Sequence, residues 1–209
     1  CGNGHIEIVK LLLNDNRVDI NEANENGRTP FWIACQNGHL EIVKLLLNDQ
    51  RIDLNKANKD GATPFYIVCQ QGNIEIVKLL LNEKRVDINK AMNDGITPFM
   101  IACYKGHIEI VKLLLNDEIV EINKATNDGS TPFYVACGKG HTEIVRLMLN
   151  DNRIDLNHQN NDGMDALWIS ASNGNLSIVK CLLNSGKKLN LKSKWDVDIS
   201  NHQANHKTV

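Results

Sequence analysis

The chain has 209 residues and a formal net charge of -2 at pH 7, with acidic and basic residues interspersed along it. It lacks the basic field that nucleic-acid binding requires, so we expect no nucleic-acid partner. The longest apolar runs, such as IVKLLL, are short and contain lysine, so we expect a soluble protein that has no membrane partner.

An internal repeat of 34 residues organises the chain. The motif Thr-Pro-Phe, which contains every proline and every phenylalanine of the sequence, recurs at Thr29, Thr63, Thr97 and Thr131. A period of this size is typical of a solenoid, in which each unit buries its apolar face by stacking on the next. In chain order we predict a partial unit at 1–23, units at 24–57, 58–91, 92–125 and 126–159, a C-terminal capping unit at 160–192 and a polar, disordered tail at 193–209.

Residues 24–57 show the structure expected of one unit. Gly27 suits a turn with positive φ, Thr29 is a good helix N-cap, and Pro30 fits the first helical position, where no N–H is needed. This first helix should end near Gly38. A second helix over 40–47 presents a broad apolar face, and residues 48–55, rich in turn formers, predict an extended loop called a finger here.

This pattern resembles an ankyrin repeat array, whose usual motif is G-x-TPLHLAA-x-x-GH-x-EIVKLLL followed by a turn that ends in D-V-N. The matching residues of the first complete unit are Gly27, Thr29, Pro30, Ala34, Gly38, His39, Glu41, Ile42, Val43, Lys44, Leu45, Leu46, Leu47, Asp53 and Asn55. The resemblance covers nearly the whole chain. It implies an all-α solenoid of stacked helix-turn-helix units with finger loops, and a non-catalytic module that binds proteins on its concave side.

The last unit departs from the pattern of the others. It replaces Thr-Pro-Phe with Asp165-Ala166-Leu167, and it carries polar Ser170 and Ser172 at repeat positions where apolar or larger residues are common. A terminal unit with a polar outer face is expected to cap a solenoid. After Trp195 the sequence has no repeat register and few apolar residues, which predicts a disordered tail.

Cysteine and histidine recur in register without forming a plausible metal site. Five cysteines, at positions 1, 35, 69, 103 and 137, occupy one repeat position and should be small core residues. Free buried thiols fit a reducing compartment, so we expect the cytoplasm, with the nucleus as the alternative. The histidines four residues later lie across a turn from the cysteines, whereas zinc needs about four converging ligands. We therefore expect no metal, no cofactor and no enzymatic activity.

One column of bulky residues replaces the histidine of the family motif. Its members are Trp32, Tyr66, Met100, Tyr134 and Trp168. A structural role between units is the favoured interpretation. An aromatic strip that faces a partner is the alternative, because Tyr and Trp are common at interfaces.

The unit 92–125 carries the strongest candidate for a partner site. The resemblance places partners on the fingers and first helices, and there this unit has Met92, Ile96 and Tyr104, where other units mostly have polar residues. Apolar clusters flanked by polar residues mark interaction sites. We predict a protein-binding groove centred on these three residues and surrounded by Lys105, Lys139 and Arg28; drift in a weakly constrained repeat is the alternative.

The resemblance also implies a modification at the fingers. Asn55, Asn89 and Asn123, together with Asn21 and Asn157, match a family position that an asparaginyl hydroxylase can modify. Turn geometry is the other role open to them.

Three functions remain open from the sequence. The first is a monomeric scaffold or adaptor that binds a protein partner. The second is the targeting arm of a larger enzyme or signalling protein, such as a kinase, ubiquitin ligase or channel, since Cys1-Gly2-Asn3-Gly4 aligns with the middle of a unit and further domains are expected outside these residues. The third is a spacer with no specific partner.

Overall fold

The computed structural model describes residues 2–189, and all of its regular elements there are helices. Eleven helices alternate between two rows along the described chain. The inner row consists of α2 (Pro30–Gln36), α4 (Pro64–Gln71), α6 (Pro98–Lys105), α8 (Pro132–Lys139) and α10 (Ala166–Ser172). The outer row consists of α1 (Ile6–Leu13), α3 (Leu40–Leu47), α5 (Ile74–Leu81), α7 (Ile108–Leu115), α9 (Thr142–Leu149) and α11 (Leu176–Leu183).

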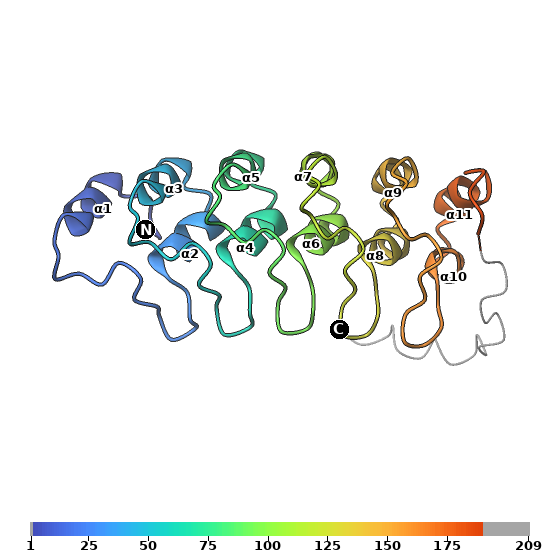
Figure 1. Ribbon diagram of the computed structural model, residues 1–209, viewed down its shortest axis with the longest axis horizontal. Helices are drawn as coiled ribbons and strands as arrows, with labels where there is room; N and C mark the ends of the chain where they lie inside the picture. The colour runs from blue at the N-terminus through green and yellow to red at the C-terminus, as the bar shows by residue number, and fades with distance from the viewer. Residues whose placement is uncertain (1, 190–209) are drawn as a thin grey trace.

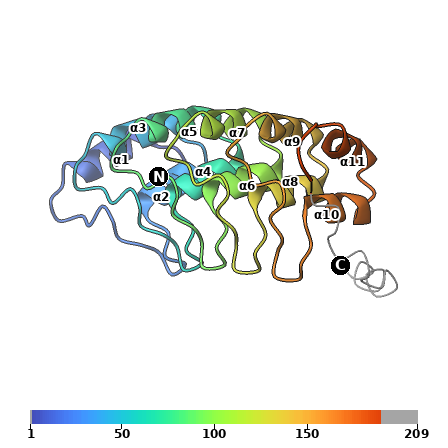
Figure 2. The same ribbon diagram turned by 45° about the vertical axis from the view of Figure 1, so that its right-hand side comes forward.

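The units stack side by side in an elongated array. Figure 1 shows the outer helices in one row, the inner helices in a second row beside it, and the fingers projecting beyond the inner helices. Figure 2 shows the same two rows from a second direction, with the outer row arched over the inner one. Consecutive inner helices pack on one another, and each inner helix also packs on the outer helix that follows it in its own unit. The predicted all-α solenoid is therefore confirmed.

The predicted threonine N-cap starts the inner helices α2, α4, α6 and α8. The Thr29 side chain accepts a hydrogen bond from the Trp32 backbone N–H at 3.1 Å, and Thr131 accepts one from the Tyr134 N–H at 3.2 Å. Proline follows each threonine at the first helical position. In the last unit Asp165 takes over this role, because its carboxylate accepts a hydrogen bond from the N–H three residues later at 2.9 Å. The change of sequence therefore preserves the capping chemistry.

The core runs as a continuous seam between the two rows. The phenylalanines of the Thr-Pro-Phe motif and the cysteines in repeat register are buried in the described units: Phe31, Phe65, Phe99, Phe133, Cys35, Cys69, Cys103 and Cys137. The cysteines from position 35 onward are free thiols. Their small side chains allow neighbouring inner helices to approach closely, as the repeat pattern predicts.

Neighbouring fingers are joined by regular hydrogen bonds near their tips. The Asn127 backbone N–H donates to the Asp94 carbonyl at 3.0 Å, and the Asn127 side-chain amide donates to the Asn93 carbonyl at 3.1 Å. The unit that follows repeats both bonds from Asn161. The fingers are therefore fixed relative to one another as well as to the helices.

The last unit differs in part from the expected cap. Ser170 is fully buried, and its hydroxyl donates to the Ala166 carbonyl at 2.6 Å, so this serine faces the interior. It contributes nothing to a polar outer face, which corrects our interpretation of it. The predicted disordered tail at 193–209, and the last residues of the unit 160–192, lie outside the described residues.

Candidate protein-interaction groove

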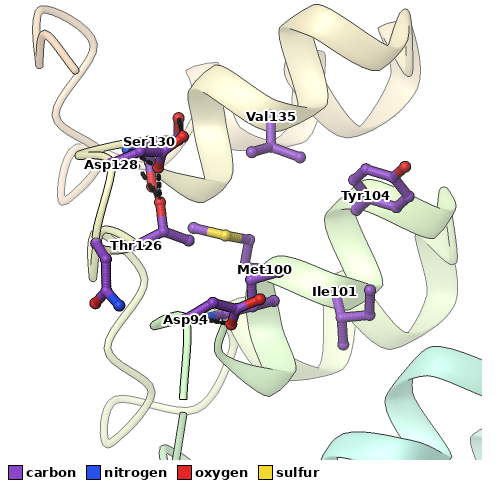
Figure 3. A pocket seen from close by; sticks show the side chains of 10 residues that line it. Asp94, Met100, Ile101, Tyr104, Thr126, Asp128, Ser130 and Val135 are labelled. Carbon is purple, nitrogen blue, oxygen red and sulfur yellow. Dashed lines mark hydrogen bonds between the residues drawn. The ribbon is translucent and has the colours of Figure 1, made fainter. Parts of the chain in front are cut away.

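A hollow of about 460 Å³ lies between the units 92–125 and 126–159. Its wall on the helix side comes from α6 and α8, and its wall on the finger side comes from the two finger tips. The lining residues are Asp94, Ile96, Met100, Ile101, Tyr104, Thr126, Asn127, Asp128, Ser130 and Val135. Figure 3 shows Tyr104 and Val135 on neighbouring helices, with Thr126, Asp128 and Ser130 gathered at the finger end. We call this hollow the groove.

The finger turn places Ile96 at the groove. Gly95 adopts a φ of 90°, and a Cβ added there would lie 2.9 Å from the Thr126 Cα. Only glycine therefore allows this turn to pack so closely on the next finger. The turn closes through the Met92 N–H, which donates to the Ile96 carbonyl at 3.0 Å, while the Ile96 N–H donates to the Asp94 carboxylate at 3.0 Å. These bonds fix Ile96 on the finger wall.

Tyr104 and two lysines form the helix end of the groove. The Tyr104 side chain is 41% exposed, an unusual value for an aromatic residue of this protein. The Lys139 ammonium lies 4.3 Å from the centroid of its ring and the Lys105 ammonium 5.7 Å from it, both within the range of cation–π attraction. The close approach of the Lys139 ammonium, with a smaller effect of Lys105, lowers the pKa of Tyr104.

Two aspartates form the opposite, finger end. The Asp128 carboxylate accepts hydrogen bonds from the Thr126 hydroxyl and from the Ser130 N–H and hydroxyl, the last two at 3.1 and 3.2 Å. The bond from Thr126 has the largest effect and lowers the pKa of Asp128. Asp94 lies at the same place in the preceding finger. The groove therefore has an apolar floor, a basic end and an acidic end.

The structure brings together most, but not all, of the residues predicted to bind a partner. Ile96 and Tyr104 line the groove, and Lys105 and Lys139 lie against the Tyr104 ring. Met92 is half-buried below the turn and packs against the core, so its side chain supports the finger. Arg28 belongs to a unit that the whole of 58–91 separates from the groove.

The structure gives Arg28 a different neighbour. Its guanidinium lies 4.8 Å from the centroid of the Trp32 ring, a stacking contact within its own unit. Arg28 therefore does not border this hollow, and its contact with a partner stays a prediction. Sequence comparison between units finds equivalent positions, but it does not reveal how far apart the units lie.

Several groove residues were missed by sequence reasoning. Ile101 and Val135 line the floor beside Met100, which the sequence had placed in the bulky column, and Asp94 and Asp128 line the finger end. Val135 occupies a position that is aliphatic in every complete unit, so a comparison between units does not single it out as a site residue. Asp94 and Asp128 also have equivalents in other fingers. A comparison restricted to variable positions cannot find such residues.

Three members of the bulky column have the structural role that was favoured, whereas Tyr134 and Trp168 are half-buried. Trp32, Tyr66 and Met100 are buried at 1%, 3% and 2% exposure. The Trp32 indole Nε1–H donates to the Ala62 carbonyl at 2.9 Å and so joins two units. Burial, with a further effect of the Asp94 carboxylate, raises the pKa of Tyr66 to about 12. These three side chains therefore stabilise the contacts of their units and do not form an exposed strip.

The finger asparagines join consecutive units. The Asn55 amide donates to the Arg85 carbonyl at 2.6 Å, and its oxygen accepts a hydrogen bond from the Asp87 N–H at 2.7 Å. Asn89 and Asn123 repeat this two-bond bridge in the next units. This role between units goes beyond the local turn geometry inferred from sequence. Hydroxylation of these asparagines stays a prediction.

The recurrent histidines also join units. The His107 imidazole forms a hydrogen bond with the Gln70 carbonyl at 3.0 Å, and the His141 imidazole does so with the Tyr104 carbonyl at 2.9 Å. Both histidines thus bond to the C-terminal end of the preceding inner helix. Within residues 2–189 no three His, Cys, Asp or Glu side chains lie close enough to hold one metal ion. No helix in the same range is long and apolar enough to cross a membrane.

Comparison with known proteins agrees with this architecture. The family described as Ankyrin repeats (3 copies) matches residues 1–58, 50–126 and 117–193. The crystal structure of EF0377, an ankyrin repeat protein, is similar with a TM-score of 0.79 and 30% sequence identity, covering 87% of this chain and 93% of that one. No curated protein sequence matches the chain.

Proposed function

Because the chain belongs to the ankyrin repeat family, whose repeats are generally protein–protein interaction modules, we propose that it binds a protein partner at the groove between units 92–125 and 126–159. The binding is non-catalytic, and the chain acts as a scaffold or adaptor. The observation that carries this proposal is an apolar hollow with a partly exposed tyrosine at its rim.

The composition of the groove supports a protein ligand. Its floor consists of Ile96, Met100, Ile101 and Val135, and charged groups lie only at its ends. Binding energy at protein interfaces concentrates in residues that fill or border such pockets, with tyrosine strongly enriched. A spacer without a partner has no need of an exposed tyrosine here, and the equivalent position of the preceding unit is Gln70.

A larger hollow in the outer row has a less suitable lining. It measures about 760 Å³ and lies between α9 and α11. Most of its lining residues are polar or charged, among them Arg146, Lys180 and Lys187, and none is aromatic. Solvated charges of this kind contribute little affinity. The groove is therefore the stronger candidate.

The rigidity of the stack also supports binding. Bonds from finger to finger and from unit to unit hold both walls of the groove before any partner arrives. A pre-formed surface loses little conformational freedom on association, so more of the contact free energy appears as affinity.

The state of the thiols supports a non-catalytic role. Burial raises the pKa of the buried thiols and brings that of Cys137 to about 12. A thiol must lose its proton to act as a nucleophile. These cysteines are therefore inert core residues at neutral pH.

Affinity capture with paired variants tests the proposal. Proteins captured from a lysate of the source cells are compared between the wild-type chain and the Ile96→Ala/Tyr104→Ala variant, and the captured partner is then titrated. Each substitution should weaken binding by about 2 kcal/mol, or thirtyfold. Gln70→Ala, at the same helical position of the preceding unit, is the control and should leave the affinity unchanged. Equal capture by the wild type and the double variant would reject the groove.

A further inference from the structure

We propose that the groove selects an acidic protein segment that carries one large apolar side chain, with its carboxylates facing Lys105 and Lys139. This inference rests on the proposed function and specifies the chemistry of the partner. It follows from the size of the floor and from the unequal charges at the two ends.

The floor is small and apolar, which suits one large apolar side chain of a partner. A volume of about 460 Å³ is near the lower end of the range for pockets that hold small ligands. The apolar side chains of Ile96, Met100 and Val135 offer no hydrogen bond to a polar group, so a polar ligand group buried there would lose its water without compensation. A leucine, methionine or phenylalanine side chain satisfies both conditions.

The basic end is local to this pair of units. At the position of Lys105 and Lys139 the two preceding units have Asn37 and Gln71, and the last unit has Asn173. In four outer helices a lysine pairs with a glutamate, as in the ion pair of Lys112 with Glu109 at 2.7 Å. Lys105 and Lys139 rest on the Tyr104 ring instead, and within residues 2–189 neither pairs with a carboxylate. Their charge is available to a partner.

The acidic end gives the partner a direction. Asp94 and Asp128 lie on the finger tips, away from Tyr104 and therefore from the two lysines that lie against its ring. A carboxylate of the partner is repelled at the finger end and attracted at the helix end, and opposed charges of this kind fix the register of a complex. The acidic residues of the segment therefore adjoin the apolar anchor on one side only.

The same charges disfavour a nucleic acid as the occupant, but they do not disfavour a second copy of this chain. A nucleic acid carries phosphates along its whole length and would meet Asp94 and Asp128 as well as the lysines. A second copy of this chain would have to present an exposed apolar residue beside carboxylates. Ile119, which is 73% exposed and follows Glu118, lies after the outer helix of the same unit, so self-association belongs among the outcomes of the test.

The test uses a phage-displayed library of random dodecapeptides, selected on the wild-type chain and on two variants. The wild type should enrich peptides with an aliphatic or aromatic residue beside Asp or Glu. The Lys105→Glu/Lys139→Glu variant should instead enrich peptides with Lys or Arg beside the anchor, and it should bind the wild-type peptides about tenfold more weakly. Both lysines are exposed, so the substitutions leave the fold intact, which circular dichroism checks.

The outcomes separate this inference from the proposed function. If the enriched peptides require Tyr104 and Ile96 for binding but are neutral or basic, the inference of an acidic partner is wrong. The proposal of a protein-binding groove is then still supported. Enrichment that is unchanged in the Ile96→Ala/Tyr104→Ala variant would reject both. Two further results would overturn the inference. They are self-association in sedimentation runs and binding of a single-stranded oligonucleotide, and either would assign the groove to that occupant if the Tyr104→Ala change abolishes it.

Discussion

Replacing Ile119 with arginine should strengthen the contact between the units 58–91 and 92–125. Other units carry arginine at this place after the outer helix, and its guanidinium reaches the end of the preceding outer helix. Arg51 donates to the Leu13 carbonyl at 2.8 Å, and Arg153 donates to the Leu115 carbonyl in the same way. The Ile119 side chain has no hydrogen-bond donor. Asp117, whose carboxylate accepts the Ile119 backbone N–H at 2.9 Å, is in place to orient a guanidinium there.

The structure sets the expected size of the gain. A hydrogen bond from a charged group contributes about 1.5–3 kcal/mol when shielded, and a cation at a helix C-terminus contributes about 0.3–1 kcal/mol at the surface. The Arg51 side chain is 47% exposed, so the lower range applies and we expect about 1 kcal/mol in total. Little is lost in exchange, because the isoleucine side chain is largely in solvent.

Urea unfolding followed by circular dichroism measures this gain. With a slope of about 2 kcal/mol per molar urea, Ile119→Arg should raise the midpoint by about 0.5 M, and the rise should shrink in 1 M salt. Arg153→Ile should lower the midpoint by a similar amount. Arg17→Ile is the control and should change little, since its side chain is 90% exposed and bonds to Asp15. If the midpoint for Ile119→Arg were unchanged, or if Arg17→Ile lowered the midpoint as much as Arg153→Ile, this would refute the reasoning.

Three further predictions concern the backbone, the carboxylates and the thiols. Gly106 and Gly174 both have positive φ, 78° and 69°, but an added Cβ would lie 2.7 Å from an imidazole of the next unit at Gly106 and would have nothing within 4 Å at Gly174. In urea unfolding the free energy of unfolding of both alanine variants should fall by about 1–2 kcal/mol. Gly106→Ala alone should show a further loss of about 1 kcal/mol, and equal losses in the two variants would contradict the close contact with the imidazole. Hydrogen bonds from Arg51 lower the pKa of Asp49 to about 2, so this pair should stabilise the fold above about pH 4 and lose its effect as the pH falls through 2. An NMR titration of the Asp49 carboxyl should give a midpoint near 2 that returns toward the ordinary value in Arg51→Ala, and a midpoint unaffected by that change would be inconsistent with the pair. Among the described thiols, alkylation of the native protein at pH 8 should reach Cys181 first, because it is only partly buried, while burial protects the others; peptide mapping that finds the buried thiols labelled equally fast would disprove the packed seam.

The sequence alone determined the repeat, the helices and their boundaries. Thr29, Pro30 and Gly38 act within a few residues of themselves, because N-capping, a fixed φ and a left-handed turn are local effects. The burial of Phe31 and Cys35 also follows from local apolar periodicity once stacking is assumed. These features are repeated in the four units from 24 to 159, so each copy supported the interpretation of the others.

The tertiary structure decided which side chains meet across units. The bridge from Asn55 to the Arg85 carbonyl, the bond of His141 with the Tyr104 carbonyl and the exclusion of Arg28 from the groove depend on the offset with which one unit stacks on the next. No local propensity encodes that offset, because it results from packing the whole apolar face of each unit. The groove, with its lysines at one end and its aspartates at the other, exists only once two units are in place.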